Sequence, residues 1–340
     1  MRIAYLPDGQ GANAAYRSIC PMRALAARGH EVRELDTTSA DGWWDLLRWC
    51  ELLHIHRVCD GGVIELARAA RATGAAVVWD DDDDVTNPPE GYRGRGVQRG
   101  YRAQRRRAAR DKLFQQLDLV TTPSDHLAGV FRAAGAPAVQ VIENYVIDEL
   151  LGERTPRQGV RIGWVAGGEH ALDARAIPIA AALERLLDAH PHVRVTTIGV
   201  RLELTSDRYT HIPLVQLTDL LRHVSAFDVG IAPLSPEVGI NHARSNIKLK
   251  EYAAVGVPWL ASPIGPYSAL GEQQGGRLVA DDRWFEELDA LVQSGRVRRR
   301  LARRASRWGR KQLLSRNVSR WEQALGEAVA RARTSVARAG

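Results

Sequence analysis

The chain has 340 residues, of which 45% are apolar, and a net charge of +7. Its length exceeds one core of ordinary size and predicts two domains, and its apolar content excludes a chain that is disordered throughout. It has no apolar run of the roughly 18 residues that a membrane span requires, no signal-peptide pattern and no metal-type spacing of its three cysteines, so we expect a cytoplasmic protein.

Strand-like and helix-like segments alternate along the first 150 residues. Strands are predicted at 2–7, 31–35, 52–58, 75–80, 118–124 and 139–144. Helices are predicted at 16–28, 42–51, 63–73 and 97–116, and a further helix follows strand 118–124 and ends at about residue 134. Alternation of this kind is typical of a parallel sheet with helices on both faces.

Gly, Pro and charged residues interrupt the alternation at 150–159, which predicts a linker. Strands are then predicted at 160–168, 193–199, 211–215, 228–234, 258–262 and 277–281. Helices are predicted at 175–189, 217–224 and 245–256, and they fill most of the remainder. The sequence therefore predicts an α/β protein with two Rossmann-like, doubly wound parallel sheets in series, facing a cleft.

Open parallel sheets bind ligands beyond the carboxyl ends of their strands, so the residues directly after strands are the candidates for a site. Arg244, Ser245 and Asn246 stand at a predicted helix start that follows strand 228–234. Ser is a good N-cap, and the free N–H groups and dipole of a helix start favour an anion such as a diphosphate.

Two charged residues follow on the same predicted helix. Lys248 adds positive charge, and the carboxylate of Glu251 is suited to accept hydrogen bonds from a vicinal diol such as a ribose. The alternative is an ordinary capped helix with exposed charges.

This segment resembles the donor-nucleotide region of retaining glycosyltransferases of the family 4 type, which have the GT-B fold and occur in bacterial cell-envelope and polysaccharide synthesis. The matching residues are Asn241, Arg244, Ser245, Lys248, Glu251, Tyr252, Ala254, Gly256 and Pro258. The resemblance implies that Glu251 binds the donor ribose, while Ser245, Asn246 and the helix start hold the diphosphate. Many members carry a second glutamate eight positions earlier, where this chain has Ala243.

The resemblance also implies a domain organisation and a reaction. Residues 1–150 would form the acceptor domain and residues 157–315 the donor domain, with a helix at about 316–338 packing back on the first. The reaction would move a hexosyl or similar group from a nucleotide diphosphate sugar to a hydroxyl of a lipid-linked, glycan or small-molecule acceptor. It would proceed with retention and without a metal or other cofactor.

The loop after the predicted strand 160–168 contains Gly167 and Gly168, which allow a phosphate to approach the backbone closely. By the same resemblance, His170 contacts the sugar or the phosphate, and we take it with Lys248 as a catalytic candidate. A structural histidine is the alternative.

Five aspartates, 80–84, stand at the end of a predicted strand. Adjacent carboxylates repel one another, so they stay exposed, gain a cation or meet a cationic or hydroxyl-bearing ligand. We expect Asp81, Asp82 and Asp83 to bind the acceptor or shape the cleft, with Asp82 as a catalytic candidate, and an acidic turn and a metal site as alternatives. Further acceptor-side candidates in the loop after the first strand are Gly9, Gly11 and Asn13.

Two basic runs, 93–112 and 296–311, each contain nine Arg or Lys residues. Such runs contact nucleic acid, anionic lipid or phosphorylated substrates, or are solvated helix faces. Alternative functions are therefore a nucleotide-sugar epimerase of the same fold and a nucleic-acid-binding or DNA-modifying protein. Peripheral contact with the inner face of an anionic membrane is a further alternative.

Overall fold

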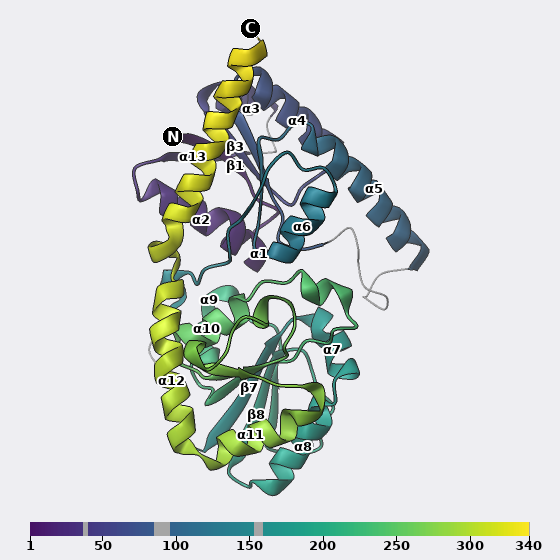
Figure 1. Ribbon diagram of the computed structural model, residues 1–340, viewed down its shortest axis with the longest axis vertical. Helices are drawn as coiled ribbons and strands as arrows, with labels where there is room; N and C mark the ends of the chain where they lie inside the picture. The colour runs from purple at the N-terminus through teal and green to yellow at the C-terminus, as the bar shows by residue number, and fades with distance from the viewer. Residues whose placement is uncertain (37–39, 85–95, 153–158, 340) are drawn as a thin grey trace.

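The computed structural model describes residues 1–36, 40–84, 96–152 and 159–339. Residues 93–95 of the first basic run and 153–158 of the predicted linker lie outside the described residues. The described part contains two six-stranded parallel sheets with helices on both faces, one sheet in each half of the chain (Figure 1). The predicted fold class, two Rossmann-like sheets in a GT-B arrangement, is confirmed.

The first sheet has the strand order β2-β1-β3-β4-β5-β6. Its strands are β1 (Arg2–Leu6), β2 (Glu31–Glu34), β3 (Leu52–His56), β4 (Ala76–Asp80), β5 (Leu119–Thr122) and β6 (Val139–Val141). The order reverses between β1 and β3, and ligands of doubly wound sheets bind at such a switch point. The loops after β1, β3 and β4 therefore meet at the carboxyl edge where a ligand is expected.

Helices connect these strands. They are α1 (Ala12–Ala14), η1 (Ala15–Ile19), α2 (Cys20–Ala26), α3 (Ala40–Trp49), α4 (Gly61–Ala72), α5 (Gly96–Phe114), α6 (Asp125–Ala133) and the short η2 (Asp148–Leu150). The first three form one continuous stretch, in which η1 is a π-helical turn. Turns of this kind occur often at functional sites, and this one carries Tyr16 and Arg17, which both enter the interior.

The second sheet has the order β12-β11-β10-β7-β8-β9, that of a dinucleotide-binding fold, with its switch point between β7 and β10. Its strands are β7 (Val160–Ala166), β8 (Val193–Gly199), β9 (Tyr209–Ile212), β10 (Val229–Ala232), β11 (Trp259–Ala261) and β12 (Gly276–Leu278). Its longer helices are α7 (Ala171–Ala176), α8 (Ile179–Ala189), α9 (Leu217–Val224), α10 (Ile247–Ala254), α11 (Trp284–Gln293), α12 (Gly295–Gly309) and α13 (Leu314–Ala339). Short turns of 3-10 helix are η3 (Gly168–His170), η4 (Gly239–His242), η5 (Gly265–Tyr267), η6 (Glu272–Gln274), η7 (Asp281–Arg283) and η8 (Arg310–Gln312).

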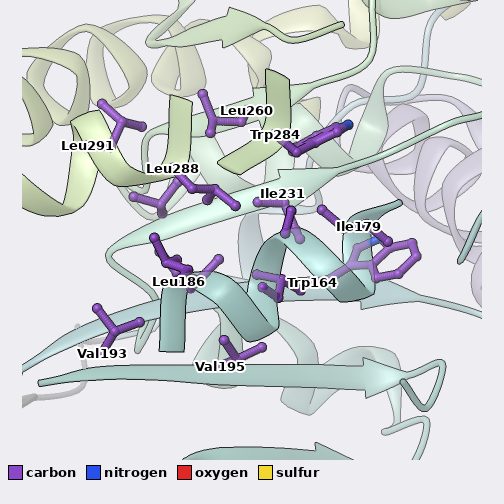
Figure 2. Close-up of a cluster of buried hydrophobic side chains, with 14 of the residues drawn as sticks. Trp164, Ile179, Leu186, Val193, Val195, Ile231, Leu260, Trp284, Leu288 and Leu291 are labelled. Carbon is purple, nitrogen blue, oxygen red and sulfur yellow. The ribbon is translucent and has the colours of Figure 1, made fainter. Parts of the chain in front are cut away.

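Each sheet is buried on both faces by apolar side chains. Figure 2 shows one of these clusters, in which Trp164 of β7, Leu186 of α8 and Leu288 of α11 lie together, all nearly or fully buried. The last helix, α13, returns to the first half, where Trp321 and Leu325 are buried in the cluster that also contains Ile3 of β1 (Figure 1). None of the described helices combines the length and apolar sequence that crossing a bilayer requires.

Two predicted helices differ from those observed. The helix predicted at 175–189 is two helices, α7 and α8, because Pro178 pushes Ile177 into an extended conformation. The helix predicted to open at Ser245 begins at Ile247, with Asn246 at the N-cap position and no side-chain capping bond. Ser245 is therefore not the N-cap.

The helix that carries the candidate donor residues, α10, is held in place by α12. A Cβ atom built at Gly309, the last residue of α12, would lie 2.4 Å from backbone atoms of Ala253 and Ala254 at the end of α10. Only glycine permits the two helices to approach so closely.

We therefore expect Gly309→Ala to lower the free energy of unfolding by about 1–3 kcal/mol, the ordinary cost of overpacking. The matched control is Gly326→Ala in α13, where a Cβ would meet nothing within 4 Å and the loss of glycine should stabilise the helix by about 0.5–1 kcal/mol. Denaturant unfolding measures both. If Gly309→Ala were as stable as the wild type, the close approach of α10 and α12 would be wrong.

Candidate functional site

A cavity of about 480 Å³ lies between the carboxyl edges of the two sheets and takes lining residues from both halves of the chain. The predicted site residues that line it are Asn13, Asp82, Asp83, Gly167, His170, Arg244, Ser245, Lys248 and Glu251. The predicted site residues that are not part of its lining are Gly9, Gly11, Asp81, Gly168 and Asn246. Residues far apart in the sequence therefore meet where the two switch points face each other.

The carboxylate of Asp173, fully buried in α7, organises the second-half side of the cavity. Its Oδ2 accepts a hydrogen bond from Nδ1 of His170 at 2.7 Å, and Nζ of Lys248 lies 3.1 Å from Nε2 of the same ring. Since the ammonium group can only donate, Nε2 accepts and the ring proton resides on Nδ1. His170 thus connects the buried carboxylate to Lys248.

The other oxygen of Asp173 holds a second cation in place. Its Oδ1 accepts from Nδ2 of Asn241 at 2.6 Å and from the backbone N–H of Ser235 at 2.9 Å. The side-chain oxygen of Asn241 in turn accepts from Nε of Arg244 at 3.0 Å. One carboxylate therefore sets the positions of both Arg244 and Lys248.

The two cations lie close enough to perturb the groups around them. Burial, reinforced by the charge of Arg244, lowers the pKa of Lys248 to about 8. Burial and the charges of Lys248 and Arg244 also hold the pKa of His170 well below its usual value, so the ring is neutral. Two cations therefore lie near each other in the cavity wall, and a bound anion would reduce the repulsion between them.

Glu251 lies one turn after Lys248 on α10, and its side chain is buried. Burial raises the pKa of its carboxyl group to about 7, although a hydrogen bond from Tyr16 opposes the rise. Tyr16 belongs to the π-helical turn η1 in the first half, and its hydroxyl donates to Oε1 of Glu251. This bond joins the two halves across the cavity.

Further hydrogen bonds join the two halves beside this one. Nδ2 of Asn144 donates to Oγ of Ser245 at 3.1 Å, and Nδ2 of Asn246 donates to Glu143 at 2.9 Å. The ammonium group of Lys250 donates to the carbonyl of Asn144 at 2.9 Å. The segment that follows β6 therefore fixes the start of α10, and Asn246 holds this segment instead of lining the cavity.

Glu169 stands between the glycine loop and Arg244. Its Oε1 lies 3.6 Å from Nη1 of Arg244, and its carboxylate occupies the space that a side chain at Gly167 would need, because a Cβ there would lie 2.3 Å from Oε2. Gly167 is thus required for the placement of Glu169.

On the first-half side, Arg57 is surrounded by the acidic run. Its Nε lies 3.4 Å from Asp82, 3.8 Å from Asp81 and 3.9 Å from Asp8, and its Nη2 lies 4.0 Å from Asp83. Arg57 has a φ of 61°, and no other non-glycine residue among those described has a positive φ. A strained backbone therefore places an arginine side chain among the carboxylates.

The carboxylates of the run have different proton affinities. Burial would raise the pKa of Asp82, but neighbouring His56 and Arg57 bring it below its usual value. Burial raises the pKa of Asp83 to about 6 against the opposing charge of Arg244, and burial together with the charge of Asp82 raises that of Asp81. Of the two members that line the cavity, Asp82 therefore remains ionised at a lower pH than Asp83 does.

Asp80, the first of the five, has a structural role. It is fully buried and paired with Arg17, whose Nε and Nη2 donate to its two oxygens at 3.0 and 2.6 Å. Asp81 is also buried and does not line the cavity. Gly9 and Gly11 are exposed and do not line it either. Within the described ranges, no group of three or more His, Cys, Asp or Glu side chains is arranged to hold a metal ion.

Several residues of the site were not among the sequence candidates. Arg57 gave no signal, because the sequence predicts it inside strand 52–58, whereas β3 ends at His56, and its positive φ is visible only in the structure. Asn144 is the last residue of the predicted strand 139–144, but β6 ends at Val141, so a correct strand end would have placed Asn144 among the residues sought after strands. Apolar residues also line the cavity on the second-half side, namely Val165, Leu214, Leu217, Leu220, Ile240 and Ile247.

No protein-family model matches the sequence, and no curated protein matches it. Solved structures match nearly the whole chain. Sucrose-phosphate synthase from Thermosynechococcus elongatus is 13% identical with a TM-score of 0.66, over 97% of this chain and 100% of its own. An alpha-glucosyltransferase in complex with UDP and a 13-mer DNA containing a HMU base is 11% identical with a TM-score of 0.67, over 96% and 99%.

A third similar structure is Anabaena Alr3699/HepE in complex with UDP and glucose, which is 15% identical with a TM-score of 0.62, over 97% of this chain and 99% of its own. At such identities the likeness shows the fold, and these structures share the two-domain GT-B architecture of this chain over its full length.

Proposed function

We propose that the chain is a glycosyltransferase that moves a sugar from a nucleoside diphosphate to an acceptor hydroxyl. The observation that carries the proposal is the convergence of Arg244, Lys248 and Glu251 in one cavity at the switch point of the second sheet. Two cations suit a diphosphate, and a buried carboxylate on the next turn suits the two hydroxyls of a ribose. The UDP in the similar alpha-glucosyltransferase and HepE structures supports a nucleotide donor.

The donor would lie against the second half of the chain. The apolar lining, which includes Leu214 and Leu217, offers a surface for the nucleobase, and its diphosphate would meet Arg244 and Lys248. In the reaction, the bond between the anomeric carbon and the diphosphate oxygen breaks, and its electron pair leaves with the nucleotide. Arg244 and Lys248 stabilise the negative charge that develops there. His170 acts as a positioning residue, because its ring orients Lys248.

The acceptor would lie against the first half. Asp82 is ionised and faces the cavity, so it can accept a hydrogen bond from the attacking hydroxyl and orient it, with Asn13 and Asp83 beside it. A new bond forms from the acceptor oxygen to the anomeric carbon, and the hydroxyl proton passes to the departing diphosphate. Retention of configuration, a hexosyl donor and independence of a divalent cation belong to this proposal, on the resemblance to family 4 enzymes.

We expect Glu251→Ala to weaken binding of the cognate nucleoside diphosphate about 10- to 100-fold, because hydrogen bonds to a charged group contribute about 1.5–3 kcal/mol. Calorimetric titration with UDP, GDP, ADP and dTDP measures the loss and identifies the base. The matched control is Glu203→Ala, an exposed carboxylate of the second half that should leave affinity unchanged. A wild type that binds no nucleoside diphosphate or nucleotide sugar would contradict the proposal.

Incubation of the wild-type protein with its nucleotide-sugar donor distinguishes transfer from epimerisation. Transfer releases a nucleoside diphosphate and depends on an acceptor, whereas epimerisation leaves the sugar attached to the nucleotide and needs no acceptor.

Donor affinity should depend on pH through Lys248 and Glu251. A bound diphosphate favours the charged form of Lys248, whose pKa in the free protein is about 8, so affinity falls as pH rises above about 8. Ribose hydroxyls favour ionised Glu251, whose pKa in the free protein is about 7, so affinity also falls as pH drops below about 7.

We therefore expect affinity for a UDP-sugar to be greatest between these two values and to change by at most about tenfold per pH unit on either side. A nucleotide sugar is the suitable ligand, because its diphosphate diester does not titrate in this range. Lys248→Met should abolish the alkaline decline and keep the acid one, and Glu251→Gln should do the reverse. An affinity that is constant from about pH 6 to about pH 9 would contradict both assignments.

A further inference from the structure

A second hollow, of about 640 Å³, lies along α12. It shares no lining residue with the cavity between the two halves, which is called the cleft from here on. Four arginines line it, Arg299, Arg303, Arg307 and Arg310, and all four are exposed. The remaining lining residues are small, namely Gly256, Ala302 and Ser306. In Figure 1, α12 runs along the outer side of the second half. The hollow is thus walled by guanidinium groups and free of bulky apolar side chains.

Three other arginines of α12 have contacts that hold the helix in place. Arg300 and Arg304 pair with Glu272 at 3.3 and 2.8 Å, and Arg298 donates to carbonyl oxygens of Leu291 and Val292 at the end of α11. Across the part of the chain that the structure describes, the four arginines of the hollow have no ion pair with a carboxylate. Their charge is therefore not needed to hold α12 in place.

The spacing of these arginines brings them to one face. Residues 299, 303 and 307 are four apart, so each follows the last by about 6 Å along the helix axis on nearly the same side. Arg310 follows within one further turn. The apolar residues Leu301 and Ala305 are fully buried and face the protein, so the outward face carries the arginines with only small residues between them. An anionic membrane could attract this face by charge, but the face has no bulky apolar side chain to insert into the bilayer.

A guanidinium group is planar and presents paired N–H donors that match the oxygens of a phosphate. Four such groups around one hollow, with like charges that repel one another, favour an occupant with several negative charges close together. Small residues between them leave room for it.

We propose that this hollow binds a ligand that carries two or more phosphate groups. The site is separate from the cleft, and its occupant is distinct from the donor of the proposed reaction. Such phosphate groups occur free in solution and on the headgroups of lipids, and the test below distinguishes the two sources.

The probe is inorganic tripolyphosphate, titrated calorimetrically at physiological ionic strength. Because the cleft also contains two cations, the titration uses the variant Arg244→Gln/Lys248→Met, in which they are removed, beside the wild type. Adding Arg303→Gln/Arg307→Gln should weaken binding at least about tenfold, since it removes two guanidinium groups that form charge-assisted pairs with the phosphates. The matched control, Arg194→Gln/Arg201→Gln, removes the same charge from exposed positions of the second half and should have no effect.

A sedimentation assay with vesicles supplies the second arm. Vesicles of equal parts cardiolipin, whose headgroup carries two phosphates, and phosphatidylcholine are compared with vesicles of phosphatidylcholine alone. Loss of binding to the anionic vesicles in Arg303→Gln/Arg307→Gln, but not in the control, supports the hollow as a headgroup site, and loss of tripolyphosphate binding alone supports a soluble ligand.

Three results would overturn the proposal. Equal weakening in the hollow variant and the control would show attraction by net charge alone. Binding of tripolyphosphate that disappears with Arg244 and Lys248 would place the anion in the cleft only. Binding of a duplex oligonucleotide through Arg303 and Arg307, with neither tripolyphosphate nor vesicles bound, would make the face a nucleic-acid surface. The first and third results leave the proposed donor binding in the cleft untested, whereas the second would support it, so failure of this proposal is distinguishable from failure of the proposed function.

Discussion

The cleft depends on one electrostatic constraint, two cations held near each other by a single buried carboxylate. Asp173 fixes Lys248 through His170 and fixes Arg244 through Asn241, so neither cation can move away to reduce the repulsion between them. The repulsion and the burial appear together in the lowered pKa of Lys248. A site prepared in this way is stabilised when an anion arrives, which is the preorganisation that departure of a diphosphate requires.

The two halves of the chain complete the site together. Tyr16 reaches Glu251 from the π-helical turn of the first half, and Asn144 reaches Ser245. The carboxylate proposed to hold the ribose thus has a partner before any donor is present. Its hydrogen bond opposes the rise in the pKa of Glu251 and keeps more of the carboxylate ionised near neutral pH. On the first-half side of the cavity, His56 and Arg57 keep Asp82 charged among neighbouring carboxylates.

The sequence was sufficient for the fold class and for much of the cleft, because both follow from local patterns. Alternating strands and helices predict parallel sheets, and the residues that follow strands must meet at one edge. The contacts that join the halves had no such pattern, since Asn144 and Ser245 are far apart in the sequence. Ser245 was taken for an N-cap because its type favours that position, but the helix starts two residues later. The strained backbone of Arg57 and the separate roles of Asp80 and Asp82 depend on packing that no single segment specifies.

The most direct test of the central claim is a crystal structure of the chain with bound UDP. The account predicts the diphosphate within hydrogen-bond distance of Arg244 and Lys248, the ribose hydroxyls on the carboxylate of Glu251, and His170 still between Asp173 and Lys248. A nucleotide bound elsewhere, or bound in the cleft with its ribose away from Glu251 and its phosphates away from both cations, would contradict it.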